Sequence, residues 1–189
     1  EFDLWKGESD AQPYIPDMVE KLKNEGFAYE SEGALVVDVT EETDKKEIPP
    51  CIIVKSNGAT LYATTDLATI VEREKLFEPD QIIYLADKRQ SLHFTQVFRV
   101  AKKSGIAKAD TELDFIGFGT MNGKDGKPFK TRDGGVLRLQ ALREQINDEV
   151  YKKMMENRDY GEEEAREISA KVGLAALKYG DLSNQASKD

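Results

Sequence analysis

The sequence lacks the features that define several large classes of protein. A single cysteine, Cys51, excludes a disulfide within the chain and is compatible with a reducing cytoplasm. No apolar run approaches the ~18 residues that a membrane-spanning helix needs, and the N-terminus does not resemble a signal peptide. Basic residues are few, with 27 Lys and Arg against 36 Asp and Glu, whereas free-standing nucleic-acid-binding proteins usually carry a basic excess. We therefore expect a cytoplasmic protein without a membrane partner. It is not a free-standing nucleic-acid binder on this count, but it is compatible with the acidic part of a larger protein whose basic surface lies elsewhere.

The residues that are present suffice for a folded protein. The 189 residues are 39% hydrophobic and 33% charged, which is ordinary for a globular protein with one sizeable core. No solenoid-type repeat and no low-complexity segment is visible. The chain begins at Glu1 without an initiator methionine and stops just beyond a helical segment, so we expect a piece of a longer protein.

Residues 1–57 form the first predicted segment, a mixed α+β region. Apolar residues at helical spacing predict an amphipathic helix over residues 10–26, which Gly26 would end. Residues 34–39 and 51–55 are typical of short strands, and the acidic stretch at 40–47 is typical of a solvated loop. Cys51 is interpreted as a small buried hydrophobic residue rather than a reactive thiol.

From Gly58 onward, strands and helices alternate. Predicted strands at 60–63 and 81–86 each lead into a helix, and a third strand at 113–118 leads into a glycine-rich loop. Thr64 or Thr65 is placed to cap the first helix, and Ser91 the second. This alternation predicts an α/β fold with parallel strands and right-handed crossovers over residues 58–138. Residues 139–189 follow as helices, whose predicted apolar faces contain Leu139, Leu142, Ile146 and Val150, and then Ala165, Ile168, Val172, Ala175 and Tyr179.

Polar side chains follow the ends of the predicted strands, where ligands bind in open α/β sheets. Tyr62 and Asp66 lie four residues apart at the first strand-to-helix junction, and an aspartate with an aromatic neighbour suits a small cationic ligand. The alternative for Asp66 is a carboxylate that only stabilises the helix N-terminus. After the second strand come residues 87–90, His93 and Gln96. His93 is the only histidine, and it is either a structural hydrogen-bonding residue or a functional base.

The glycine-rich loop at residues 117–135 is the strongest purely chemical signal. Six glycines allow close approach of the backbone, and Lys124, Lys127, Lys130 and Arg132 supply mobile positive charge. This combination after a strand is typical of a polyphosphate site. The loop lacks the spacing of the nucleoside-triphosphate P-loop, and an ordinary solvated loop is the alternative interpretation.

Taken in order, these motifs resemble bacterial arginyl-tRNA synthetases, a family of class I aminoacyl-tRNA synthetases. The resemblance is strongest at residues 58–68, 93–98 and 125–132, and it extends to residues 5–9, 31–34 and 55–56, so it covers essentially the whole chain. It implies the C-terminal half of a Rossmann-like (HUP-type) parallel sheet with flanking helices. Residues 1–57 would be an inserted segment, and residues 139–189 a helical tRNA-stem-contact region leading to a missing anticodon-binding domain.

The resemblance also implies roles for individual residues. The positions that contact the arginine substrate are matched by Tyr62, Asp66 and Gln90. The positions at or near the ATP site are matched by His93, Gln96, Met121, Phe129 and Lys130. The candidate catalytic cations, which would stabilise the departing pyrophosphate, are Lys127, Lys130 and Arg132. The implied partners are L-arginine, ATP as a substrate and tRNA(Arg), with Mg²⁺ in the full enzyme and no metal ligand assigned in this chain.

Two departures from the family pattern limit what this chain is expected to do alone. The loop contains Phe-Lys-Thr-Arg instead of Lys-Met-Ser-Lys-Ser, and no motif like His-Ile-Gly-His occurs. We therefore expect the isolated chain to be inactive and to self-associate through an exposed sheet edge, and the full enzyme to be monomeric. The competing hypotheses are a non-catalytic arginine-binding module and a generic nucleotide-binding α/β domain.

Overall fold

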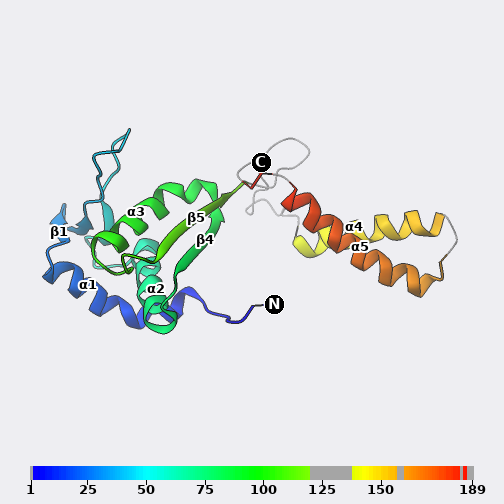
Figure 1. Ribbon diagram of the computed structural model, residues 1–189, viewed down its shortest axis with the longest axis horizontal. Helices are drawn as coiled ribbons and strands as arrows, with labels where there is room; N and C mark the ends of the chain where they lie inside the picture. Colours follow the sequence, from blue (N-terminus) through cyan, green and yellow to red (C-terminus); the bar gives the residue numbers. More distant parts are fainter. Residues whose placement is uncertain (1, 120–137, 157–159, 184, 187–189) are drawn as a thin grey trace. The chain divides into compact units, whose positions relative to one another are not determined.

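The computed structural model of the chain describes residues 2–119, 138–156, 160–183 and 185–186. Its backbone divides into two compact units, Glu1–Ile116 and Gly117–Asp189 (Figure 1). The elements of the first unit are, in chain order, η1 (Glu8–Tyr14), α1 (Ile15–Asn24), β1 (Ala28–Ser31), β2 (Ala34–Val37), β3 (Cys51–Val54), α2 (Tyr62–Phe77), β4 (Gln81–Asp87), η2 (Lys88–Gln90), α3 (Ser91–Lys103) and β5 (Glu112–Phe118), whose last two residues lie past the boundary. The second unit contains α4 (Leu139–Glu156) and α5 (Glu162–Leu182).

The N-terminal part of the first unit is a helix packed with an antiparallel sheet in the order β1-β2-β3. Leu22 of α1 shares one fully buried core with Val37 of β2 and Ile53 of β3. The sequence analysis did not predict β1. Its hairpin turn uses Glu32 and Gly33, whose φ angles of 50° and 78° suit a two-residue turn between antiparallel strands. Glu-Gly is not one of the pairs, Asn-Gly or Asp-Gly, that usually predict such a turn, so the local sequence does not indicate this hairpin.

The predicted strand at residues 60–63 is wrong. Thr60 makes only an isolated antiparallel bridge to Val54, and helix α2 already begins at Tyr62. Thr64 decides this local structure, because its buried hydroxyl accepts a hydrogen bond from the Leu61 N–H at 3.1 Å and donates one to the Ile53 carbonyl at 2.5 Å. Thr64 thus caps α2 from inside its first turn, as the third residue of the helix, and ties the start of α2 to β3.

The predicted parallel pair is present as β4 and β5. Both strands begin beside each other, where the Glu112 N–H donates to the Asp80 carbonyl, and they run in the same direction (Figure 1). Helix α3 packs on one face of this strand pair, and its Val97 and Val100 side chains are fully buried. The predicted Ser91 cap is wrong: the short helix η2 precedes α3, and the Asp87 side chain caps η2 by accepting from Arg89 N–H.

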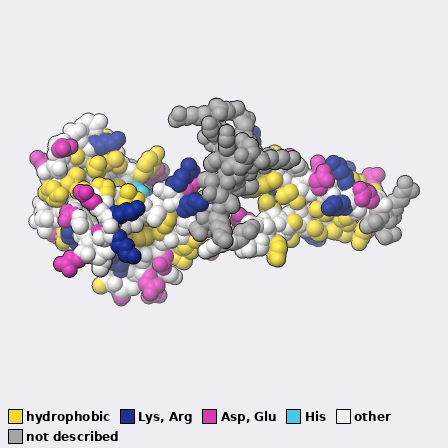
Figure 2. Space-filling view, turned by 90° about the horizontal axis from the view of Figure 1, so that it is seen from above, with side chains coloured by type: hydrophobic (Ala, Val, Ile, Leu, Met, Phe, Trp, Pro, Cys, Tyr) yellow, Lys and Arg dark blue, Asp and Glu magenta, His cyan; other side chains and the backbone are white. Residues whose placement is uncertain are grey.

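The other side of β4 and β5 carries apolar side chains at the surface. Burial alternates along both strands, and Ile83, Leu85 and Ile116 are 51%, 68% and 43% exposed. Figure 2 shows hydrophobic side chains between charged ones on the surface of the chain. The expected self-association stays a prediction, because exposure alone does not identify what covers a surface.

The acidic loop at 40–47 is largely exposed, as predicted, and α3 holds it through Asp44. The Arg99 guanidinium donates to both carboxylate oxygens of Asp44, at 2.7 and 2.6 Å, and to the Val39 carbonyl at 2.8 Å. These hydrogen bonds from Arg99, with one from the Glu41 backbone, lower the pKa of Asp44 to about 2. A bidentate arginine–carboxylate pair of this kind fixes geometry as well as charge.

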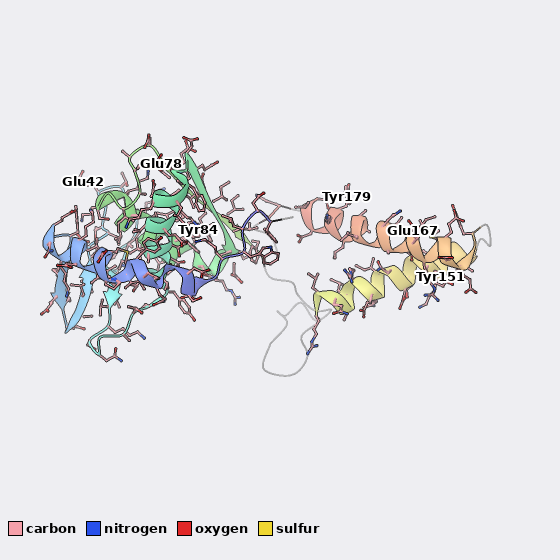
Figure 3. All side chains as sticks on the ribbon, turned by 90° about the horizontal axis from the view of Figure 1, so that it is seen from below. Glu42, Glu78, Tyr84, Tyr151, Glu167 and Tyr179 are labelled. Atoms are coloured by element: carbon pink, nitrogen blue, oxygen red, sulfur yellow. The ribbon has the colours of Figure 1, made fainter. Side chains whose placement is uncertain are left out.

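Replacing Asp44 by asparagine is expected to reduce the acid sensitivity of folding. Because the folded-state pKa of Asp44 lies below its unfolded value of ~3.9, the pair stabilises the fold fully above about pH 4 and is lost as the pH falls toward 2. Denaturant unfolding between pH 6 and pH 2.5 measures this as a smaller decrease in the free energy of unfolding for Asp44→Asn. Glu42→Gln, which removes an exposed acid of the same loop (Figure 3), is the matched control. An equal acid dependence for wild type and Asp44→Asn would contradict the prediction.

The second unit is a pair of packed helices, α4 and α5. The predicted apolar face of α5 is correct at Ala165, which is fully buried, and wrong at Val172 and Tyr179, which are 45% and 76% exposed. The buried residues of α5 are all small: Ala165, Ser169 and Gly173. Gly173 lies so close to Asn147 of α4 that an added Cβ would be 2.0 Å from the asparagine Oδ1. The small residues therefore permit close approach of the two helices, which hydrophobic periodicity does not reveal.

Candidate functional site

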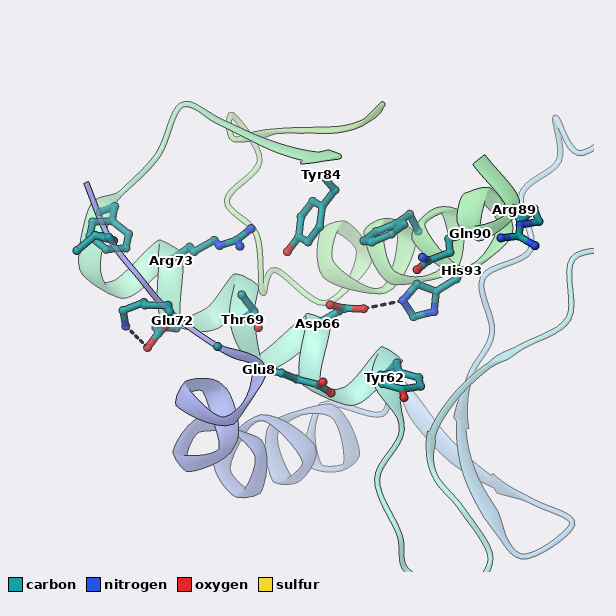
Figure 4. Close-up of a pocket in the computed structure, with 15 residues that line it drawn as sticks. Glu8, Tyr62, Asp66, Thr69, Glu72, Arg73, Tyr84, Arg89, Gln90 and His93 are labelled. Carbon is teal, nitrogen blue, oxygen red and sulfur yellow. Dashed lines mark hydrogen bonds and ion pairs between the residues drawn. The ribbon is translucent and has the colours of Figure 1, made fainter. Parts of the chain in front are cut away.

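A pocket of about 920 Å³ opens in the first unit between α2, β4, η2, the start of α3 and the N-terminal segment (Figure 4). It is lined by Leu4, Lys6, Gly7, Glu8, Tyr62, Asp66, Thr69, Glu72, Arg73, Phe77, Tyr84, Arg89, Gln90, His93 and Phe94. Its volume lies within the range of small-molecule sites, and its lining mixes aromatic rings with a few converging charges. It is therefore the candidate binding site.

Tyr62 and Asp66 occupy the first turns of α2 and lie on the same side of the helix, one turn apart. Tyr62 is 75% exposed, so its ring stands open to the pocket entrance. The Asp66 carboxylate is partly buried, and its Oδ2 lies 2.6 Å from Nε2 of His93 on α3. The two helices thus bring together an aspartate and a histidine that are 27 residues apart in the sequence.

Gln90 lies at the end of η2, directly before α3, and lines the same end of the pocket. Its position depends on the turn between β4 and α3. In that turn Asp87 accepts from Arg89 three times, from the backbone N–H and from Nε and Nη2 at 2.8, 2.9 and 2.6 Å. These hydrogen bonds from Arg89 lower the pKa of Asp87 to about 2. The Asp87 carboxylate is consequently a structural anchor of the turn.

The other end of the pocket is built from residues that the sequence analysis did not select. The Arg73 guanidinium lies 4.9 Å from the centre of the Tyr84 ring, a cation–π arrangement. Lys6 and Glu72 form an ion pair at 2.6 Å. The Tyr84 hydroxyl is buried without a hydrogen-bond partner among the described residues, and burial raises its pKa to about 12. Helical spacing could have identified part of this end of the pocket. Thr69 and Arg73 follow Asp66 at i+3 and i+7, so all three lie on the same face of α2.

The structure brings some predicted site residues together and separates others. Tyr62, Asp66, Gln90 and His93 all line the pocket. Gln96 does not: its side-chain amide donates to the Pro49 carbonyl at 2.7 Å instead. The remaining predicted residues lie outside the described part of the chain: Met121, Lys127, Phe129, Lys130 and Arg132.

The charge of the pocket favours a cation at one end. Glu8 and Asp66 stand on the same side as Tyr62 (Figure 4), and the Glu8 carboxylate accepts from the Thr65 hydroxyl at 2.8 Å. An ionised carboxylate matches a guanidinium in charge and in planar geometry. Within the described residues, no group of three or more His, Cys, Asp or Glu side chains is arranged to hold a metal ion. None of the described helices is long and apolar enough to cross a membrane.

Comparison with known proteins gives one consistent result. The family model of the class I (R) tRNA synthetase catalytic domain matches residues 1–189. The chain is 66% identical over 194 residues to the arginine–tRNA ligase of Agathobacter rectalis and 62% identical over 189 residues to that of Alkaliphilus oremlandii. Both matches cover 100% of this chain and 32% of the relative, so the chain spans about a third of the length of these curated relatives.

Solved structures show the same fold. The arginyl-tRNA synthetase of Plasmodium falciparum superimposes with a TM-score of 0.80 at 23% identity, covering 98% of this chain and 30% of that one. The Thermus thermophilus arginyl-tRNA synthetase superimposes with a TM-score of 0.71 at 17% identity, covering 96% and 35%. The expected Rossmann-like α/β fold is confirmed by these neighbours together with the β4–β5 pair. With its whole length matched by the family model, the chain belongs to the class I tRNA synthetase (R) catalytic-domain family.

Proposed function

We propose that this chain is part of an arginine–tRNA ligase and that its pocket holds the side chain of L-arginine. The observation that carries the proposal is the partly buried Asp66 carboxylate beside Tyr62 and Gln90 in one pocket. Relatives that match the entire chain at 66% and 62% identity bear the name arginine–tRNA ligase. A carboxylate at the base of the site would pair with the guanidinium, while the phenol and the amide would complete its hydrogen bonds.

The proposed reaction has two steps. An oxygen of the arginine carboxylate attacks the α-phosphorus of ATP, and the bond to the β-phosphate oxygen breaks, so that pyrophosphate leaves with the bonding electrons. A hydroxyl of the terminal ribose of tRNA then attacks the carbonyl carbon of the arginyl-adenylate, and AMP leaves. Catalysis of this kind depends mainly on orientation of the reactants and on stabilising the charge of the transferring phosphoryl group.

The residues proposed for the ATP end rest on the family resemblance. Lys127, Lys130 and Arg132 would neutralise the departing pyrophosphate, and Met121 and Phe129 would lie near ATP. Mg²⁺ would add charge neutralisation in the full enzyme, and the described residues of this chain offer no cluster to hold it. The monomeric state, the cytoplasmic location and the domain bounds at residues 57 and 138 also remain predictions.

Arginine selectivity tests the proposal. In the full-length protein that carries this chain, arginine is expected to support ATP–pyrophosphate exchange at least about a hundredfold better than citrulline or lysine, because a site with buried polar partners rejects analogues that leave them unpaired. In parallel, amide-shift NMR of this chain with L-arginine shows whether Tyr62, Asp66 and Gln90 respond. Tight ATP binding without any arginine selectivity would favour a generic nucleotide-binding domain. Arginine binding without exchange would favour a binding module.

A further inference from the structure

The sole histidine of the chain makes its closest polar contact with the proposed arginine-binding carboxylate, His93 Nε2 lying 2.6 Å from Asp66 Oδ2. We propose that His93 is a positioning residue of the arginine site, which holds Oδ2 of Asp66 so that Oδ1 is presented to the guanidinium. The family resemblance associates His93 with ATP instead. The inference rests on the proposed function and adds to it a residue that sets substrate affinity.

The geometry of the pair supports an orienting role. Asp66 projects from α2 and His93 from α3, so the hydrogen bond joins two separate helices across the pocket (Figure 4). The side chains are 28% and 26% exposed, which leaves part of the carboxylate open to a ligand. The imidazole ring also contacts the Phe94 ring edge-on, with the ring centres 5.0 Å apart. Because Asp66 and Phe94 hold the His93 ring on two sides, the ring in turn holds the Asp66 carboxylate in one orientation. Arginine binding then costs less side-chain conformational freedom.

The direction of the hydrogen bond follows from the chemistry of the two groups. An ionised carboxylate only accepts, so Nε2 of His93 must carry the proton that the bond uses. The Nε2–H donor of His93 therefore engages Oδ2 of Asp66 and leaves Oδ1 to accept from the guanidinium.

Steady-state kinetics of the full-length protein test the inference through two variants. His93→Ala removes the hydrogen-bond donor and is expected to raise the KM for arginine by about tenfold or more, with the KM for ATP within about twofold of wild type. His93→Gln retains a side-chain N–H donor and is expected to keep the arginine KM within about threefold of wild type. Thr95→Ala, which removes only a hydroxyl bonded to the Ser91 carbonyl on the same helix, is the control and should match wild type.

The outcomes separate the inference from the proposed function. A raised ATP KM with an unchanged arginine KM would overturn the positioning role and return His93 to the ATP site. An arginine KM raised equally in His93→Gln and His93→Ala would also overturn it, because the retained N–H donor would then restore nothing. If wild type shows no arginine selectivity at all, the proposed function fails and the inference fails with it.

A direct measurement on this chain covers the case in which a variant folds poorly. Because His93 is the only histidine, the ring ¹⁵N signals report on it without assignment. Replacing Asp66 by asparagine is expected to shift the population of the Nε2-protonated tautomer, because the acceptor that holds this proton is changed. Ring signals that are the same in wild type and Asp66→Asn would show that the pair does not form in solution, and the inference would be wrong.

Discussion

Replacing Asp66 by alanine is expected to reduce arginine-dependent ATP–pyrophosphate exchange by about a thousandfold or more. Truncating one partner of a desolvated charge pair costs about 2–5 kcal/mol or more, because the remaining charge is left buried and unpaired. The Asp66 side chain is only partly buried and lies in a pocket rather than in the core, so the variant should still fold. The loss of activity is measured by ATP–pyrophosphate exchange kinetics at varied arginine concentration. Folding of the variant is measured by a thermal melt of the same sample.

Two further variants make the Asp66 prediction specific. Asp66→Asn keeps the shape of the side chain and removes its charge, so it should be nearly as defective as alanine if the charge is what arginine needs. Glu78→Gln removes an exposed acid at the other end of α2 (Figure 3) and should leave arginine kinetics unchanged. Ordinary arginine kinetics in Asp66→Ala would exclude this pocket as the arginine site.

Replacing Phe94 by alanine is expected to lower the free energy of unfolding by about 3–5 kcal/mol, the largest loss of stability among the substitutions predicted for this chain. The Phe94 side chain is 5% exposed. Its ring stacks on Phe115 of β5 with centres 5.0 Å apart, and it packs against Tyr84 of β4 at 4.8 Å and Phe98 at 5.7 Å. The ring therefore joins α3 to both strands of the parallel pair, and its removal would leave a cavity between them.

Urea unfolding followed by far-UV circular dichroism measures the effect of Phe94→Ala. Phe94→Leu fills most of the volume without the aromatic contacts and should lose clearly less. Phe2→Ala, which truncates a phenylalanine that is 71% exposed, should change stability by less than about 0.5 kcal/mol. A loss below about 1 kcal/mol for Phe94→Ala would mean that the space collapses without cost, and that the aromatic cluster does not join α3 to the sheet.

Several features were accessible from the sequence because they depend on local spacing. Helical periodicity correctly placed α3, whose Phe94, Val97 and Ala101 are buried, and alternating strands and helices indicated the parallel pair. The four-residue spacing of Tyr62 and Asp66 also placed both on one side of α2, although the strand expected before them is absent.

The rest of the site depended on contacts between distant residues. The sequence by itself determined the amphipathic helices α1 and α3 and the β4–β5 pair, because a periodic pattern of 3.6 or 2 residues needs no knowledge of partners. Only the tertiary structure paired His93 with Asp66 and Lys6 with Glu72, the latter 66 residues apart, and excluded Gln96 from the pocket. Such pairs are decided by how packed elements meet in three dimensions. A hydrogen bond across two helices leaves no periodic mark in the sequence of either helix.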